Sequence, residues 1–120
     1  MIVLDSSALL AYLQGESGAD RVREHLDGGG VVSTANWSEV AQKMRRVDSW
    51  AISRSLLLSF PLQISSVTVD EAEAAAAMWE EGSPLSLADR LCLALADRLE
   101  LPVLSADRAW FDLPRVIALR

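Results

Sequence analysis

Four carboxylates occupy positions from which a folded chain could do metal chemistry. Asp5 and Asp107 each follow a short apolar run with the composition of a β-strand, and Glu39 lies in the first turns of an expected helix after another such run. Because ligand sites in parallel sheets form outside the carboxyl ends of the strands, we expect these three acids at one edge of a sheet. The fourth acid, Asp89, lies near the N-terminal end of an apolar helix stripe, where an unpartnered charge is costly.

Each acid also has a purely local explanation. Asp89 follows Ser86 by three residues and Glu39 follows Asn36 by three, which is the spacing of a helix capping box. The two acids that follow strands could simply end the strand or cap the next turn. These explanations treat the acids singly. Four like charges at one sheet edge would repel one another unless a cation joined them or some stayed protonated.

A cluster of Asp and Glu without His or Cys suits a hard divalent cation, because Mg²⁺ and Mn²⁺ prefer oxygen ligands. A cation held there would activate water and neutralise charge that develops on a phosphate. We expect Asp5 and Asp89 to be direct ligands, since strand ends and buried helix positions are rigid. Asp107 and Glu39 would complete the shell, directly or through water.

Short apolar runs alternate with helical patterns along the sequence. Strands are expected over residues 2–5, 31–33, 62–65, 102–105 and 116–119. Helices are expected over residues 8–14, 17–27, 35–46, 49–59, 69–81 and 86–99. This alternation, with strands that are apolar throughout, is typical of a parallel sheet covered by helices on both faces. We therefore predict a three-layer α/β sandwich with a short, mostly parallel central sheet, formed by a single domain over residues 1–120.

The composition favours a folded protein of a reducing compartment. Hydrophobic residues make up 51% of the chain, no apolar run is long enough for a membrane helix, and no signal peptide is recognisable. The single cysteine, Cys92, excludes an internal disulfide and is expected in the core, whereas the single histidine, His25, is expected to be solvated. We therefore expect a cytoplasmic protein without a membrane partner.

The net charge of −6 is awkward for a protein that binds phosphates, which need basic groups. Setting four acids aside as cation ligands leaves 13 acidic residues against 11 basic ones. Phosphate contacts would then come from arginine, whose planar fork binds oxygens in pairs. Arg90 and Arg108 adjoin two of the acids and are candidate contacts. The cluster of Lys43, Arg45 and Arg46 could equally be a solvated helix face.

Two expected helices, over residues 8–14 and 49–59, carry many large apolar side chains. A chain of 120 residues is not expected to bury all of them. The surplus indicates a partner surface for a second copy or for a peptide.

At four places the sequence resembles the PIN-domain family. Residues 2–12, IVLDSSALLAY, resemble its first motif, in which a strand leads to an Asp and small hydroxyl residues. Residues 36–40, NWSEV, resemble the second motif, residues 85–96, LSLADRLCLALA, the third, and residues 101–110, LPVLSADRAW, the fourth. The motifs come in the family's order and span nearly the whole chain. The likeness is greatest to VapC-type toxins.

This resemblance implies hydrolysis of RNA phosphodiester bonds with Mg²⁺ or Mn²⁺, as the toxin of a type II toxin–antitoxin pair. It also implies a homodimer, a cognate VapB-type antitoxin, and a hydrogen bond from Ser7 to the first acid, with Arg90 and Arg108 as possible RNA contacts. Ser105 and Trp110 stand where threonine and phenylalanine are common, and neither is expected to touch a proposed carboxylate. The resemblance assigns metal binding and catalysis to Asp5, Glu39, Asp89 and Asp107.

Other classes of protein fit less well. A phospho-accepting receiver domain needs a lysine after a late strand, but the only lysine is Lys43, in the middle of the chain. A phosphatase with an aspartate nucleophile needs a second Asp two residues after the first, where this chain has Ser7. The remaining alternative is a PIN-like binding module without catalysis, in which the acids serve only as caps.

Overall fold

The computed structural model describes residues 1–120, and its centre is a five-stranded, wholly parallel sheet in the order β3-β2-β1-β4-β5. The strands are β1 (Ile2–Leu4), β2 (Gly30–Ser33), β3 (Leu62–Ser65), β4 (Val103–Ser105) and β5 (Val116–Ala118). The helices are α1 (Ser6–Leu13), α2 (Ala19–Asp27), α3 (Thr34–Arg46), α4 (Trp50–Leu58), α5 (Val69–Ala77) and α6 (Leu87–Leu99), with a 3₁₀ turn η1 (Arg108–Trp110). The predicted α/β fold is confirmed.

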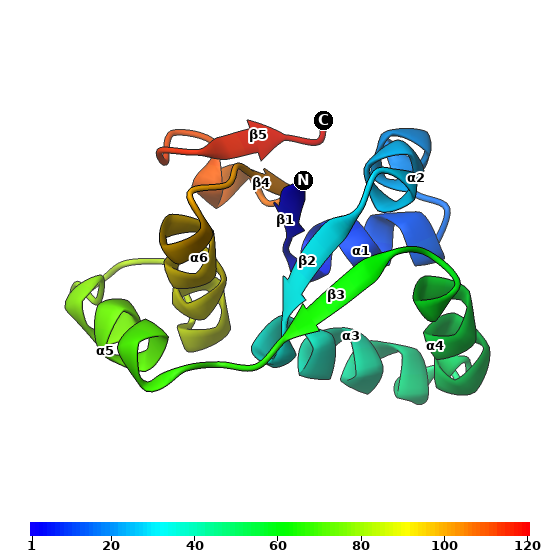
Figure 1. Cartoon of the computed structure of the whole chain (residues 1–120), viewed down its shortest axis with the longest axis horizontal. Helices are drawn as coiled ribbons and strands as arrows, with labels where there is room; N and C mark the ends of the chain where they lie inside the picture. The colour runs from blue at the N-terminus through cyan, green and yellow to red at the C-terminus, as the bar shows by residue number, and fades with distance from the viewer.

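Helices cover both faces of the sheet because strand residues point alternately to opposite sides. In β1, Ile2 and Leu4 face the core formed with α1 to α4, whereas Val3 faces a second core formed with α6. Helix α5 packs against α6, farther from the sheet (Figure 1). The three layers are therefore α1 to α4, the sheet, and α6 with α5. None of the helices combines the length and apolar character that crossing a lipid bilayer requires.

Several helix boundaries differ from the predicted ones, and an N-cap residue sets the starts of α1 and α3. Helix α1 begins at Ser6 rather than residue 8, because the Asp5 side chain accepts a hydrogen bond from the Ala8 amide and serves as N-cap. Helix α3 is capped by Ser33, the last residue of β2, and not by Asn36. Helix α5 ends at Ala77, four residues earlier than predicted. Capping by the residue at the strand end joins each strand directly to its helix.

The expected surplus of apolar side chains lies mainly on α4. Leu9 and Leu57 are fully buried, so part of the apolar material on α1 and α4 belongs to the core. Ile52, Leu56 and Leu58 on α4 are exposed, Ile52 to 74%. This exposed face of α4 is the feature that the predicted partner surface requires, and its occupant stays a prediction.

Candidate active site

Asp5 is the most buried acid of the proposed cluster, at 2% exposure. It follows β1 and accepts three kinds of hydrogen bond: from the Ala8 amide at 2.8 Å, from Ser105 Oγ at 2.6 Å, and from Ser7 Oγ, which lies 2.7 and 2.8 Å from the two carboxylate oxygens. Burial raises the pKa of Asp5 to about 6, against the lowering effect of these hydrogen bonds, and repulsion from Asp89 adds to the rise. The Asp5 carboxylate is therefore held in one orientation, and it takes up a proton more readily than an exposed aspartate does.

The end of β4 is tied to the same carboxylate. Ser105 Oγ donates to Asp5 and accepts from the Asp107 amide at 3.0 Å. Ser7 Oγ accepts from the Ala106 amide at 2.9 Å. The expectation that Ser105 would not touch a proposed carboxylate is wrong. Ser105 ends a strand adjacent to β1, and this register points its hydroxyl at Asp5.

Glu39 is oriented by two side chains from different helices. Ser6 Oγ at the start of α1 donates to Glu39 Oε1 at 2.9 Å, and Asn36 Nδ2 donates to the same oxygen at 3.0 Å. Asn36 is fully buried, and its Oδ1 has no hydrogen-bond partner. The sequence indicated Asn36 only as a possible cap. Its position three residues before Glu39, on the same helix face, was the signal for a role in orienting that acid.

Asp89 forms the capping box that its spacing from Ser86 suggested. Its Oδ2 accepts from the Ser86 amide at 2.9 Å, and its own amide donates to Ser86 Oγ at 3.1 Å. Partial burial raises the pKa of Asp89, and repulsion from Glu39 and Asp107 contributes in the same direction. A cap alone explains the hydrogen bonds but not the repulsion from acids on two other elements.

Asp107 has the local role that was weighed for it. It caps η1, with its Oδ1 accepting from the Ala109 amide at 3.0 Å, and its side chain is exposed. Asp107 follows β4, which pairs in parallel with β1, and therefore lies at the same carboxyl edge of the sheet as Asp5. Figure 1 shows why: β1, β2 and β4 end on one side of the sheet, where α1 and α3 begin beside α6.

The donor set fits a hydrated Mg²⁺ or Mn²⁺ better than a closed cage. All candidate ligands are carboxylate oxygens, and none of the four acids takes part in an ion pair of the protein. No group of three or more Asp, Glu, His or Cys side chains is drawn together closely enough to enclose an ion. Magnesium keeps several of its waters in such sites, so carboxylates spaced around a hydrated ion satisfy its chemistry.

The two arginines beside the acids differ in their surroundings. Arg90 Nη1 donates to the Ala75 carbonyl of α5 at 2.9 Å, and its Nε is buried without a partner. Its guanidinium therefore ties α6 to α5. Arg108 is exposed beside Asp107 and is open to a ligand.

Cys92 lies in the core, as expected. Burial there raises the pKa of its thiol well above the ordinary value and keeps the thiol uncharged.

Comparison with known proteins agrees with this fold. The sequence matches the family model of the PIN domain over residues 2–116, and the chain therefore belongs to the PIN-domain family. It is 33% identical over 115 residues to ribonuclease VapC42 of Mycobacterium tuberculosis, an alignment that covers 86% of this chain and 88% of the relative.

Two solved structures share the fold. A toxin–antitoxin complex from Klebsiella pneumoniae superposes with a TM-score of 0.83 at 20% identity, covering 100% of this chain and 98% of that chain. DNA-bound VapBC from Salmonella typhimurium superposes with a TM-score of 0.74 at 14% identity, covering 100% of each chain. The three-layer arrangement is thus that of the PIN fold.

Proposed function

We propose that the protein is a Mg²⁺- or Mn²⁺-dependent endoribonuclease and the toxin of a type II toxin–antitoxin pair. The observation that carries the proposal is the buried Asp5 at the carboxyl end of β1, where Ser7 Oγ and Ser105 Oγ both donate to its carboxylate and hold it in place. The similarity to ribonuclease VapC42 supports RNA as the substrate.

Asp5 and Asp89 would hold the cation directly, and Asp107 and Glu39 directly or through water. The bound cation supplies an activated water and stabilises negative charge on the phosphate. Ser7, Ser105 and the Ala8 amide keep the Asp5 carboxylate in one orientation. Asn36 and Ser6 do the same for Glu39, so that neither acid needs to reorganise during the reaction.

Metal dependence is the direct test of this function. The purified protein is expected to cleave single-stranded RNA with added Mn²⁺ or Mg²⁺ and to stop when the ion is removed with EDTA, because the acids alone would repel a phosphate. Fragments are measured on a denaturing gel, and a parallel preparation of Asp89→Asn controls for contaminating nuclease. Cleavage that continues in EDTA would contradict the metal mechanism. Absence of cleavage with every divalent ion would favour a binding module without catalysis.

Ser105 offers a test of the hydrogen-bond shell. Ser105→Ala removes a donor to Asp5 and an acceptor for the Asp107 amide, and we expect cleavage to fall about 10- to 100-fold, as for other groups that orient metal ligands. Ser105→Thr retains the hydroxyl and is expected to keep most activity. The rates are compared at saturating Mn²⁺. Equal activity of the alanine variant and the wild type would show that Asp5 needs no support from β4.

The proposed partners are a VapB-type antitoxin and a second copy of this chain. Support comes from the similarity to toxin–antitoxin complexes and from the exposed apolar residues Ile52, Leu56 and Leu58 on α4. We propose that the protein acts in the cytoplasm, where its RNA substrate would be found. Growth arrest on induction in a bacterium, relieved by a gene that neighbours this one, would support the toxin role.

A further inference from the structure

The hairpin of α3 and α4 is positively charged in an otherwise acidic protein. Residues 34–60 contain four basic residues and two acidic ones, whereas the whole chain has a net charge of −6. Three of these bases, Lys43, Arg45 and Arg46, lie in the last turns of α3 and are exposed. The positive charge is therefore gathered at the C-terminal part of one helix.

The guanidinium groups of Arg45 and Arg46 have no partner within the protein. The ion pairs of the molecule involve Arg98, Arg115 and Arg120, and neither Arg45 nor Arg46 forms a side-chain hydrogen bond. The carbonyl end of α3 favours nearby positive charge, which accounts for basic residues at this place. This preference for positive charge does not account for the surface pocket that Arg45 and Arg46 line.

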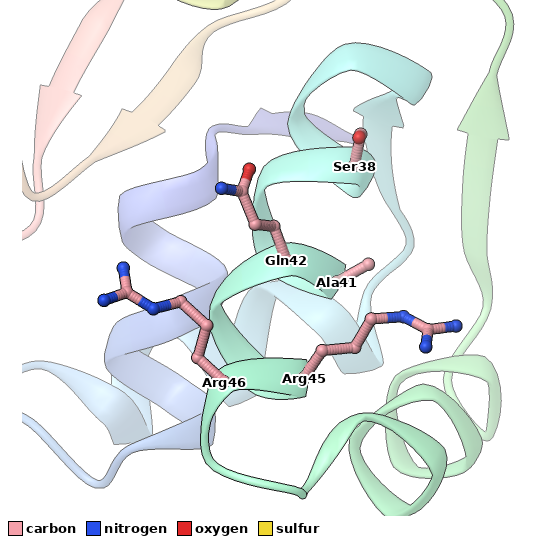
Figure 2. A pocket seen from close by; sticks show the side chains of 5 residues that line it. All are labelled: Ser38, Ala41, Gln42, Arg45 and Arg46. Atoms are coloured by element: carbon pink, nitrogen blue, oxygen red, sulfur yellow. The ribbon is translucent and has the colours of Figure 1, made fainter.

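This pocket has a volume of about 440 Å³ and lies on the surface of α3. Figure 2 shows Gln42 and Arg46 on one side of it and Ser38 and Arg45 on the other, with the small Ala41 side chain between them. The two arginines thus extend to opposite sides of the helix, and the methyl group of Ala41 forms the bottom of the pocket between them. Polar and basic groups border this pocket on two sides.

The pocket lies on the same helix as Glu39, one of the acids of the candidate active site. Glu39 lies on the same face of α3 as Gln42 and Arg46, three and seven residues further along. At ~1.5 Å per residue, Arg46 lies roughly 10 Å along the helix axis from Glu39. A nucleic-acid strand whose scissile phosphate lies at the acids would therefore meet this pocket with a neighbouring part of its backbone.

We propose that the pocket lined by Ser38, Ala41, Gln42, Arg45 and Arg46 binds the RNA backbone on one side of the scissile bond; this rests on the proposed ribonuclease function. Arginine and glutamine supply donors suited to phosphate oxygens. They also offset the repulsion between RNA and the acidic site. An acidic protein segment is the less favoured occupant, because arginine anchors in protein interfaces are accompanied by aromatic or large apolar groups and this lining has only Ala41.

The test compares Arg45→Ala/Arg46→Ala with Arg23→Ala/Arg120→Ala, which removes the same charge and also the exposed ion pair of Arg120 with Glu16. Arg23 and Arg120 are exposed, on α2 and at the C-terminus, which Figure 1 places on the opposite side of the molecule from α3. Binding of a fluorescent random-sequence single-stranded RNA is measured in EDTA over a range of salt concentrations. Cleavage of a long natural RNA is measured with Mn²⁺, and a synthetic Asp/Glu-rich peptide serves as the competing ligand.

The α3 variant is expected to bind RNA about tenfold more weakly for each arginine lost, with the slope of log affinity against log salt reduced by about 0.7 per lost phosphate contact. Its KM for the long RNA should rise while kcat stays close to the wild-type value, and the control variant should change little.

RNA binding and cleavage by the α3 variant equal to those of the control variant would overturn the subsite. Loss of peptide binding alone would assign the pocket to a protein partner instead. A wild type that neither binds nor cleaves RNA would overturn the ribonuclease function itself, and the subsite with it.

Discussion

Asp5→Asn is expected to leave the fold intact and to reduce RNA cleavage by at least about a hundredfold, since changes to groups that merely support a metal ligand already cost 10- to 100-fold. The variant keeps an oxygen for the Ala8 amide but loses the negative charge that would bind the cation. Its new amide group can donate to Ser7 or Ser105, because each hydroxyl has a second lone pair. The loss should therefore be chemical rather than structural. Initial rates of RNA cleavage with Mn²⁺ measure it.

A matched control separates charge at the site from charge elsewhere. Asp27→Asn makes the same substitution at the exposed last residue of α2 and should cleave RNA at the wild-type rate. Circular dichroism and a cooperative unfolding transition establish that both variants are folded. If folded Asp5→Asn degrades RNA as fast as the control, Asp5 does not belong to the catalytic machinery.

The positions of the acids were predictable because they follow from topology. A strand followed by Asp5 and another that ends before Asp107 must deliver both residues to one sheet edge once the sheet is parallel. The alternation of apolar runs and helices established that parallel sheet without knowledge of any contact. The strand over residues 62–65 was predicted with the bounds that the structure shows. Pro61 comes directly before this run, and the serines at positions 65 and 66 end it.

The hydrogen bonds within the site were less predictable, because they depend on register and rotamer rather than on pattern. Nothing in the order of residues shows that Ser105, a hundred positions away, donates to Asp5. The same limit applies to Arg90, whose neighbour Asp89 suggested a phosphate contact. Its Nη1 donates to the Ala75 carbonyl, a direction set by the packing of α5 on α6, and its role as an RNA contact stays a prediction.

The local explanations for the acids proved compatible with the functional one. Asp89 does form a capping box and Asp107 does cap a turn, as their spacings suggested. Capping fixes each carboxylate against its own backbone, which is the rigidity that a metal ligand needs. In this site the same hydrogen bonds that stabilise helix ends also orient the proposed ligands, so the presence of a cap is no argument against catalysis.

In metal-free buffer the wild-type protein is expected to lose stability, relative to Asp5→Asn, as pH rises through the pKa of Asp5. This pKa is raised from 3.8 in the unfolded chain to about 6 in the fold, so the native state binds the extra proton and is favoured at low pH. Two pKa units correspond to roughly 3 kcal/mol, which should be lost between about pH 4 and pH 6.5 and be fully absent above it. Asp89, whose pKa is also raised, is present in both proteins, so its own titration largely cancels in this difference. Urea unfolding of both proteins in EDTA at several pH values measures the difference.

Added Mn²⁺ should reverse the sign of this effect in the wild type. A bound cation favours the ionised carboxylates, so its stabilisation grows with pH as the competing protons leave. The midpoint of urea unfolding for the wild type should rise with Mn²⁺ near neutral pH and change little near pH 4, while that of Asp5→Asn should respond weakly at both. A difference between the two proteins that is independent of pH in EDTA would show that Asp5 does not titrate in this range. A wild type indifferent to Mn²⁺ would remove the reason for four acids to share one edge of the sheet.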